Sequence, residues 1–163
     1  MKKYMTIVFS TLTLGTIIGY FTGESIGINQ QPILQELQLS DILPHNYVVA
    51  LIIFVTGLFS LGMLSSFIIF INGMSLGILI GAFKNTEYFY LVFFKTIPHA
   101  IVELVGFSFV GISVLFLIKY IHVRTTGTKD NLLSLKTLQN SSVKFFIQGY
   151  IFITIAGFIE VYL

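Results

Sequence analysis

Apolar residues lie along this chain in long, nearly uncharged runs that are separated by short polar segments. A helix needs about 20 mainly apolar residues to cross the hydrocarbon core of a bilayer. Residues 42–83 contain no Lys, Arg, Asp or Glu, which is too long a run for one crossing and enough for two. We expect a break between them near Gly62 to Ser66. The pattern predicts five membrane spans, at residues 4–22, 46–62, 64–83, 97–119 and 143–162.

The segments outside these spans are short and polar. Residues 84–96 indicate an interfacial loop, since charged residues there are mixed with aromatic ones. Loop 23–45 is expected to hold a short amphipathic piece at 33–43. Residues 1–3 carry two lysines, as a signal peptide would, but the small-residue pattern of a cleavage site is a poor match. We therefore expect the first run to be retained as a span.

Composition fits this pattern, because 55% of residues are hydrophobic, 10% are charged and the mean hydropathy is +0.92. About a quarter of the residues of a soluble domain are charged. A backbone exposed to lipid must satisfy its own hydrogen bonds, which favours helices. We expect an all-α integral membrane bundle of about five transmembrane helices, forming a single domain over 1–163. The absence of cysteine excludes disulfides and thiolate metal sites.

The charges of the loops predict the orientation. Loop 23–45 contains three acids and no Lys or Arg, whereas segment 119–144 contains a single acid, Asp130. The basic residues of that segment are Lys119, Arg124, Lys129, Lys136 and Lys144. Short basic loops stay in the cytoplasm. We expect a cytoplasmic N-terminus and basic loop 120–142, with loop 23–45 and the C-terminus outside.

Polar residues within the predicted spans are candidates for a site, because a charge at mid-bilayer costs about 2.5–3.5 kcal/mol. They are Asn46, Asn72, His99, Glu103 and Glu160. In the stretch "TIPHAIVEL", Pro98 suits the first turn of a helix, and Glu103 follows His99 by one turn on the same face. Four of the five residues fall in the outer half, so the sequence predicts a shared polar cluster. Its role is either packing and assembly, or chemistry and transport.

Glycines at positions 73, 77 and 81 are spaced four apart. Such spacing lets helices approach closely. Gly73, Gly77 and Gly81 therefore predict a packing face, with a narrow path lined by glycine as the alternative.

No complete catalytic set is present. There is no GxSxG and no Walker loop. His99 and Glu103 are two potential ligands, while a zinc site needs three or four. A metallopeptidase would need His45, Glu160 or a residue of an unseen partner to complete the set of metal ligands. We expect no cofactor and no resident metal.

Three motifs resemble the stage II sporulation protein M family of bacterial membrane proteins. They are Asn72, Gly73, Leu76 and Gly77, then "PHAIVEL" at 98–104, and a terminal "GFIE" at 157–160. The resemblance covers residues 45–163, although this chain has Ala100 where the family more often has glycine. It implies a bundle of about five helices in the bacterial cell membrane, without an established enzyme activity. Members act with cell-wall hydrolases in spore formers, and short relatives occur in gene clusters for circular bacteriocins or beside transporter components.

Three functions remain open from the sequence. The first is a non-catalytic scaffold or an export and maturation partner, as in circular bacteriocin biosynthesis, secretion or immunity. The second is an intramembrane metal-dependent peptidase or cyclase using His99, Glu103 and Glu160. The third is a small proton-coupled transporter with Glu103 as the coupled group. We favour the first. The expected partners are the lipid bilayer and other membrane proteins or a small hydrophobic peptide, and not nucleic acid.

Overall fold

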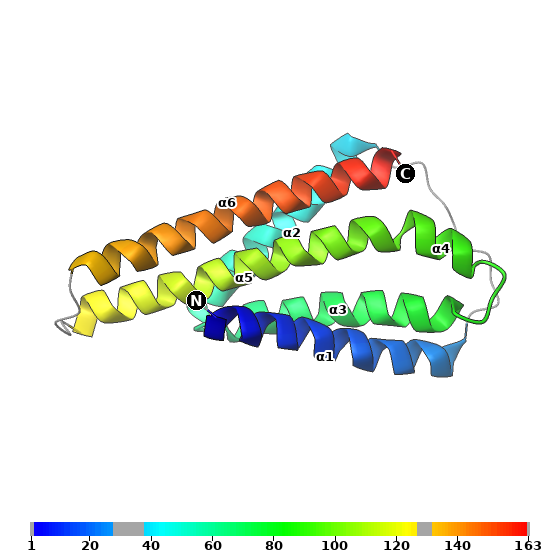
Figure 1. Ribbon diagram of the computed structural model, residues 1–163, viewed down its shortest axis with the longest axis horizontal. Helices are drawn as coiled ribbons and strands as arrows, with labels where there is room; N and C mark the ends of the chain where they lie inside the picture. Colours follow the sequence, from blue (N-terminus) through cyan, green and yellow to red (C-terminus); the bar gives the residue numbers. More distant parts are fainter. Residues whose placement is uncertain (1, 28–37, 127–131, 163) are drawn as a thin grey trace.

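A computed structural model describes residues 2–27, 38–126 and 132–162, which form an elongated bundle of helices without strands (Figure 1). The helices are α1 (Lys2–Ile26), α2 (Leu39–Phe59), α3 (Met63–Phe83), α4 (Phe89–Lys95), α5 (Ile97–Thr126) and α6 (Leu132–Tyr162). All except α4 are long and apolar enough to cross a membrane. The prediction of an all-α membrane bundle is confirmed.

The break between the second and third spans is a tight turn over residues 60–62. Leu61 (φ 55°) and Gly62 (φ 91°) both adopt left-handed backbone, which glycine tolerates without steric cost. The Gly62 N–H donates to the carbonyl of Gly57 at 2.7 Å, and Ser60 Oγ accepts from the N–H of Leu64 at 2.8 Å. The turn lies at the N-terminal edge of the segment in which it was expected.

Two loop expectations were wrong in extent. Segment 84–96 is not a loop throughout, because Phe89–Lys95 forms α4. Basic loop 120–142 is mostly helical, since α5 continues to Thr126 and α6 begins at Leu132. At a rise of 1.5 Å per residue, the 30 residues of α5 span about 45 Å, beyond the roughly 30 Å hydrocarbon core. The amphipathic piece expected at 33–43 lies mostly outside the described residues, and α2 begins at Leu39.

Helices α1 and α3 run parallel and in close contact. Gly15 and Gly19 of α1 lie against Phe70 and Met74 of α3, while Gly77 of α3 lies against the backbone of Thr16 and Tyr20. The nearest neighbours of a Cβ atom built at these glycines are main-chain atoms of the other helix. Only residues without a side chain allow two backbones to approach this closely.

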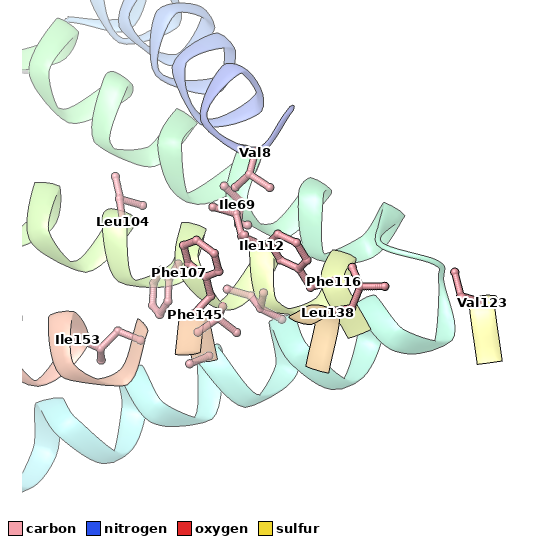
Figure 2. Close-up of a cluster of buried hydrophobic side chains, with 13 residues drawn as sticks. Val8, Ile69, Leu104, Phe107, Ile112, Phe116, Val123, Leu138, Phe145 and Ile153 are labelled. Carbon is pink, nitrogen blue, oxygen red and sulfur yellow. The ribbon is translucent and has the colours of Figure 1, made fainter. Parts of the chain in front are cut away.

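Helix α5 is the centre of the bundle and pairs with α6 in antiparallel fashion. Gly106 and Val110 of α5 face Gly149 and Ile153 of α6. Figure 2 shows side chains from α1, α3, α5 and α6 meeting in one apolar cluster, in which the ring of Phe116 stacks on that of Phe145 at 5.7 Å. Helix α2 runs antiparallel to α6, because its Leu43 contacts Gly157 and its Phe54 contacts Phe146.

The bundle therefore has two distinct ends. At one end α5 begins beside α4 and α6 finishes, and we call this the His99 end (Figure 1). At the other end the hairpin of α5 and α6 extends past the N-terminus (Figure 1). We call it the basic end, because it carries the exposed residues Lys119, Arg124, Lys136 and Lys144. Which end faces the cytoplasm stays a prediction from the loop charges.

Candidate functional site

The junction of α4 and α5 positions the first candidate residue, His99. The last carbonyls of a helix lack partners within it, and Pro98 has no N–H with which to supply one. His99 Nδ1 lies 3.0 Å from the carbonyl oxygen of Lys95, at the end of α4. A carbonyl only accepts, so Nδ1 carries a proton and donates. The imidazole therefore caps α4 and holds the bend between the two helices.

The other ring nitrogen of His99 points toward α6. Its Nε2 is 3.9 Å from Oε1 of Glu160, and the two side chains are 12% and 21% exposed. This separation is too long for a direct hydrogen bond, but it suits an ion pair or one bridging water. His99 thus links three elements: α4 through Lys95, its own helix α5, and α6 through Glu160.

Glu103 lies one turn deeper on α5 and is half-buried. It lies on the same face of α5 as His99, whose imidazole faces Glu160 of α6.

The two asparagines of the predicted cluster are not bonded to these three residues in the part of the chain that the structure describes. Asn72 Nδ2 donates to the carbonyl of Ile68 in its own helix at 2.8 Å. Asn46 is buried in α2, at 6% exposure. Gly111 of α5 lies against Ile69 of α3, and the two helices are antiparallel. Asn72 is therefore at the same depth as Ser108, about one turn deeper in the bundle than Glu103. The structure thus brings His99 and Glu160 together, with Glu103 one turn deeper on the helix of His99 and the asparagines as separate polar positions.

A second polar contact lies at the His99 end of the bundle and joins α1 to the residue that follows α3. Lys84, just after α3, forms an ion pair with Glu24 of α1. Its Nζ also donates to the hydroxyl of Tyr20 at 3.2 Å and lies 5.2 Å from the centre of that ring. The hydrogen bond to Glu24 is the main cause that raises the pKa of Lys84 above 10.5. Sequence analysis missed this pair, because it depends on α1 and α3 ending side by side.

Buried hydroxyl groups were also missed. Ser113 of α5 and Ser142 of α6 are both buried, with their Oγ atoms 3.2 Å apart, and Ser142 Oγ donates to the carbonyl of Ser113 at 2.9 Å. Tyr47 of α2 and Thr154 of α6 share a hydrogen bond of 2.7 Å. Ser108 Oγ is the one buried side-chain polar atom without a partner among the described residues. Serines and threonines within apolar runs are the only signal in the sequence, and they do not reveal which ones meet.

No group of three His, Asp or Glu side chains within residues 2–27, 38–126 and 132–162 is arranged to hold a metal ion. His45, considered as a possible third ligand, is exposed on α2. His99 and Glu160 form a polar contact between α5 and α6, and Glu103 lies one turn deeper on α5.

Comparison with known proteins gives one match. The model of the family Stage II sporulation protein M matches residues 5–163, nearly the whole chain, and the chain belongs to this family. The resemblance seen in the sequence motifs is confirmed and extends further toward the N-terminus than the motifs did. No curated protein and no solved structure matches the chain.

Proposed function

We propose that this member of the stage II sporulation protein M family is a non-catalytic membrane scaffold that assists export or maturation of a small hydrophobic peptide. The observation that carries the proposal is the placement of His99 between Lys95 and Glu160. His99 contacts α4 through Lys95 and α6 through Glu160. A side chain engaged in such contacts is suited to fixing the shape of a surface.

The His99 end remains accessible to a partner. The side chain of Glu160 is 21% exposed, and Tyr162 in the same last turn of α6 is 81% exposed. A polar terminus or a basic group of a peptide can reach the cluster without entering the bundle core. The setting that we propose, circular bacteriocin production, rests on the small size of the chain and on its composition, rich in Ile, Phe and Lys.

The test uses a deletion strain of the bacterium that carries the gene, in which the wild-type chain restores release of the mature peptide and resistance to it. A photo-activated cross-linking residue is placed at Tyr162 in one variant and at Ile147 in a matched control. Ile147 is 53% exposed on the same helix, in its middle. We expect the variant at Tyr162 to cross-link to the peptide or to a membrane protein that handles it, and the variant at Ile147 not to do so.

Two outcomes would contradict the proposal. One is a deletion that leaves both peptide release and resistance unchanged. The other is equal cross-linking from both positions, which would mean that the His99 end has no preference for a partner.

A further inference from the structure

A groove near the basic end lies far from the polar cluster and is not used by the proposed function. It is a hollow of about 260 Å³ between α5 and α6, and Phe54 of α2 also lines it. Its walls are Ser113, Leu117 and Tyr120 from α5, and Gln139, Val143 and Phe146 from α6. We refer to it as the α5–α6 groove.

Two small residues, Ser113 and Ser142, line the groove and leave space between the helices. Ser113 and Ser142 bond to each other through their hydroxyls, so neither presents an unsatisfied polar group to an occupant. An apolar occupant therefore loses no hydrogen bond on entering. Val143, 53% exposed on one wall, opens the groove to the side of the bundle, where lipid lies.

The size of the groove suits a single hydrocarbon chain. A dry cavity of about 150 Å³ holds benzene, and pockets for drug-sized ligands start near 300 Å³. The groove falls between these limits at about 260 Å³. A peptide helix, which is about 10 Å across, is too wide for it.

The mouth of the groove is basic. Tyr120 lines the groove, and its hydroxyl accepts a hydrogen bond from Nη1 of Arg124 at 3.1 Å. The guanidinium is thus held one turn beyond the apolar wall. Lys136 lies one turn beyond Gln139 on the opposite wall and is exposed. Asp130 is the only acid between residues 113 and 146.

The groove also lies at the level where the apolar run of α5 ends. The apolar run of α5 stops at Ile118, and Lys119 is its first charged residue after Glu103. On α6, Lys144 is exposed about one to two turns nearer the centre of the bundle than Lys119, since Gly149 packs against Val110 and Ser142 against Ser113. From the end of the apolar run of α5 we expect the apolar part of the groove to lie beside acyl chains and its basic mouth beside headgroups.

We propose that the α5–α6 groove binds one anionic phospholipid, with an acyl chain along Leu117, Val143 and Phe146 and the phosphate between Arg124 and Lys136. The apolar walls alone would accept any lipid. The two cations at the mouth select an anionic headgroup, and the lipid then ties the protruding hairpin of α5 and α6 to the membrane surface. This site is independent of the His99 cluster, so either proposal can fail without the other.

The experiment measures lipid binding to the full-length chain in detergent by native mass spectrometry. Phosphatidylglycerol, phosphatidylcholine and soluble glycerol phosphate are titrated separately. We expect phosphatidylglycerol to bind more tightly than phosphatidylcholine, and glycerol phosphate not to compete. Arg124→Gln should weaken phosphatidylglycerol binding roughly fivefold, because a basic residue near an anionic surface contributes about 1 kcal/mol, and should leave phosphatidylcholine binding unchanged.

A matched pair of variants tests the groove itself. Val143→Trp fills the groove, whereas Ile147→Trp adds the same bulk one turn away at a residue of equal exposure, 53%. The first should lose the bound phosphatidylglycerol and the second should keep it. Equal retention in both variants, an unchanged affinity in Arg124→Gln, or competition by glycerol phosphate would overturn the proposal. Both tryptophans lie at exposed positions, and the melting temperature of each variant confirms that it is folded.

Discussion

Replacing Gly77 by alanine adds one methyl group at a position where the backbones of α1 and α3 are in close contact. A Cβ atom at this position would contact the carbonyl oxygen of Thr16 and would lie 2.7 Å from the nitrogen of Tyr20 and 2.9 Å from the carbonyl carbon of Thr16. All three atoms belong to a helix backbone, which cannot rotate away. The two helices must therefore separate to admit the methyl group.

Gly111→Ala is the matched control. Gly111 is also buried within a long helix, but its new Cβ would meet only the terminal methyl of Ile69, at 2.6 Å, with Val8 next at 3.9 Å. A side-chain methyl can rotate aside. Both substitutions gain about 1 kcal/mol of helix propensity, since alanine favours a helix over glycine. The difference between the two variants therefore isolates the backbone collision.

Overpacking of a filled interior costs about 1–3 kcal/mol, and we expect Gly77→Ala to be less stable than Gly111→Ala by this amount. For a chain of this size, each kcal/mol lowers the melting temperature by about 2–4 °C. Thermal melting of both proteins in the same detergent should show Gly77→Ala lower by roughly 2–12 °C. Equal melting temperatures, or a higher one for Gly77→Ala, would show that α1 and α3 do not pack through their glycines.

Two further predictions concern the ends of the bundle. The chain has no cysteine, so Ser25→Cys and Thr126→Cys can each be labelled alone with an impermeant maleimide on whole cells. Only Ser25→Cys should react. Labelling of Thr126→Cys alone would mean that the orientation is inverted, and equal labelling of both would mean that the number of spans is wrong. Lys84→Met should lower the melting temperature at neutral pH by removing the ion pair with Glu24. Because the pKa of Lys84 is raised above 10.5 by this partner, the protonated lysine stabilises the fold below that pH and loses its effect as the pH rises through the raised pKa. If the difference in melting temperature between wild type and variant persists at a pH above the raised pKa, the effect comes from packing of the side chain.

The apolar runs predicted the spanning helices well, because burial in lipid demands a long uncharged stretch wherever a helix crosses. They predicted the helix ends poorly. Beyond the bilayer a helix needs no apolar residues, so α5 continues through Lys119 and Arg124 to Thr126 without a signal in hydropathy. Helix α4 is only seven residues long, too short for a hydrophobic pattern to distinguish it from a loop rich in aromatic residues.

The candidate site was predicted only in part for a related reason. The spacing of His99 and Glu103 fixes a shared face of one helix, and the placement of Glu160 at the end of the last span gives it the same depth. Their meeting follows from the antiparallel pairing of α5 and α6. Asn72 has similar polarity, but its amide is occupied by the carbonyl of Ile68 within its own helix. Spacing along one chain does not reveal such local competition.

The pairing of α1 with α3 was likewise not evident. Gly15 and Gly19 have the same spacing as Gly73, Gly77 and Gly81, but several other helices also carry glycine. Only the three-dimensional arrangement shows that these two stripes face each other in parallel. The same holds for Ser113 and Ser142, which are distant in sequence and leave the α5–α6 groove between their helices.

The central claim is that His99, Glu103 and Glu160 hold helices together and perform no chemistry. Glu103→Gln tests it most directly, because glutamine keeps the shape and hydrogen bonding of the side chain and removes its charge and its transferable proton. Glu103→Leu serves as the control, since it removes the polar contact altogether. We predict that Glu103→Gln melts like the wild type and restores peptide release in the deletion strain, while Glu103→Leu loses stability. A Glu103→Gln protein that melts normally and yet fails to restore peptide release would contradict the claim and assign the carboxyl to proton transfer or catalysis.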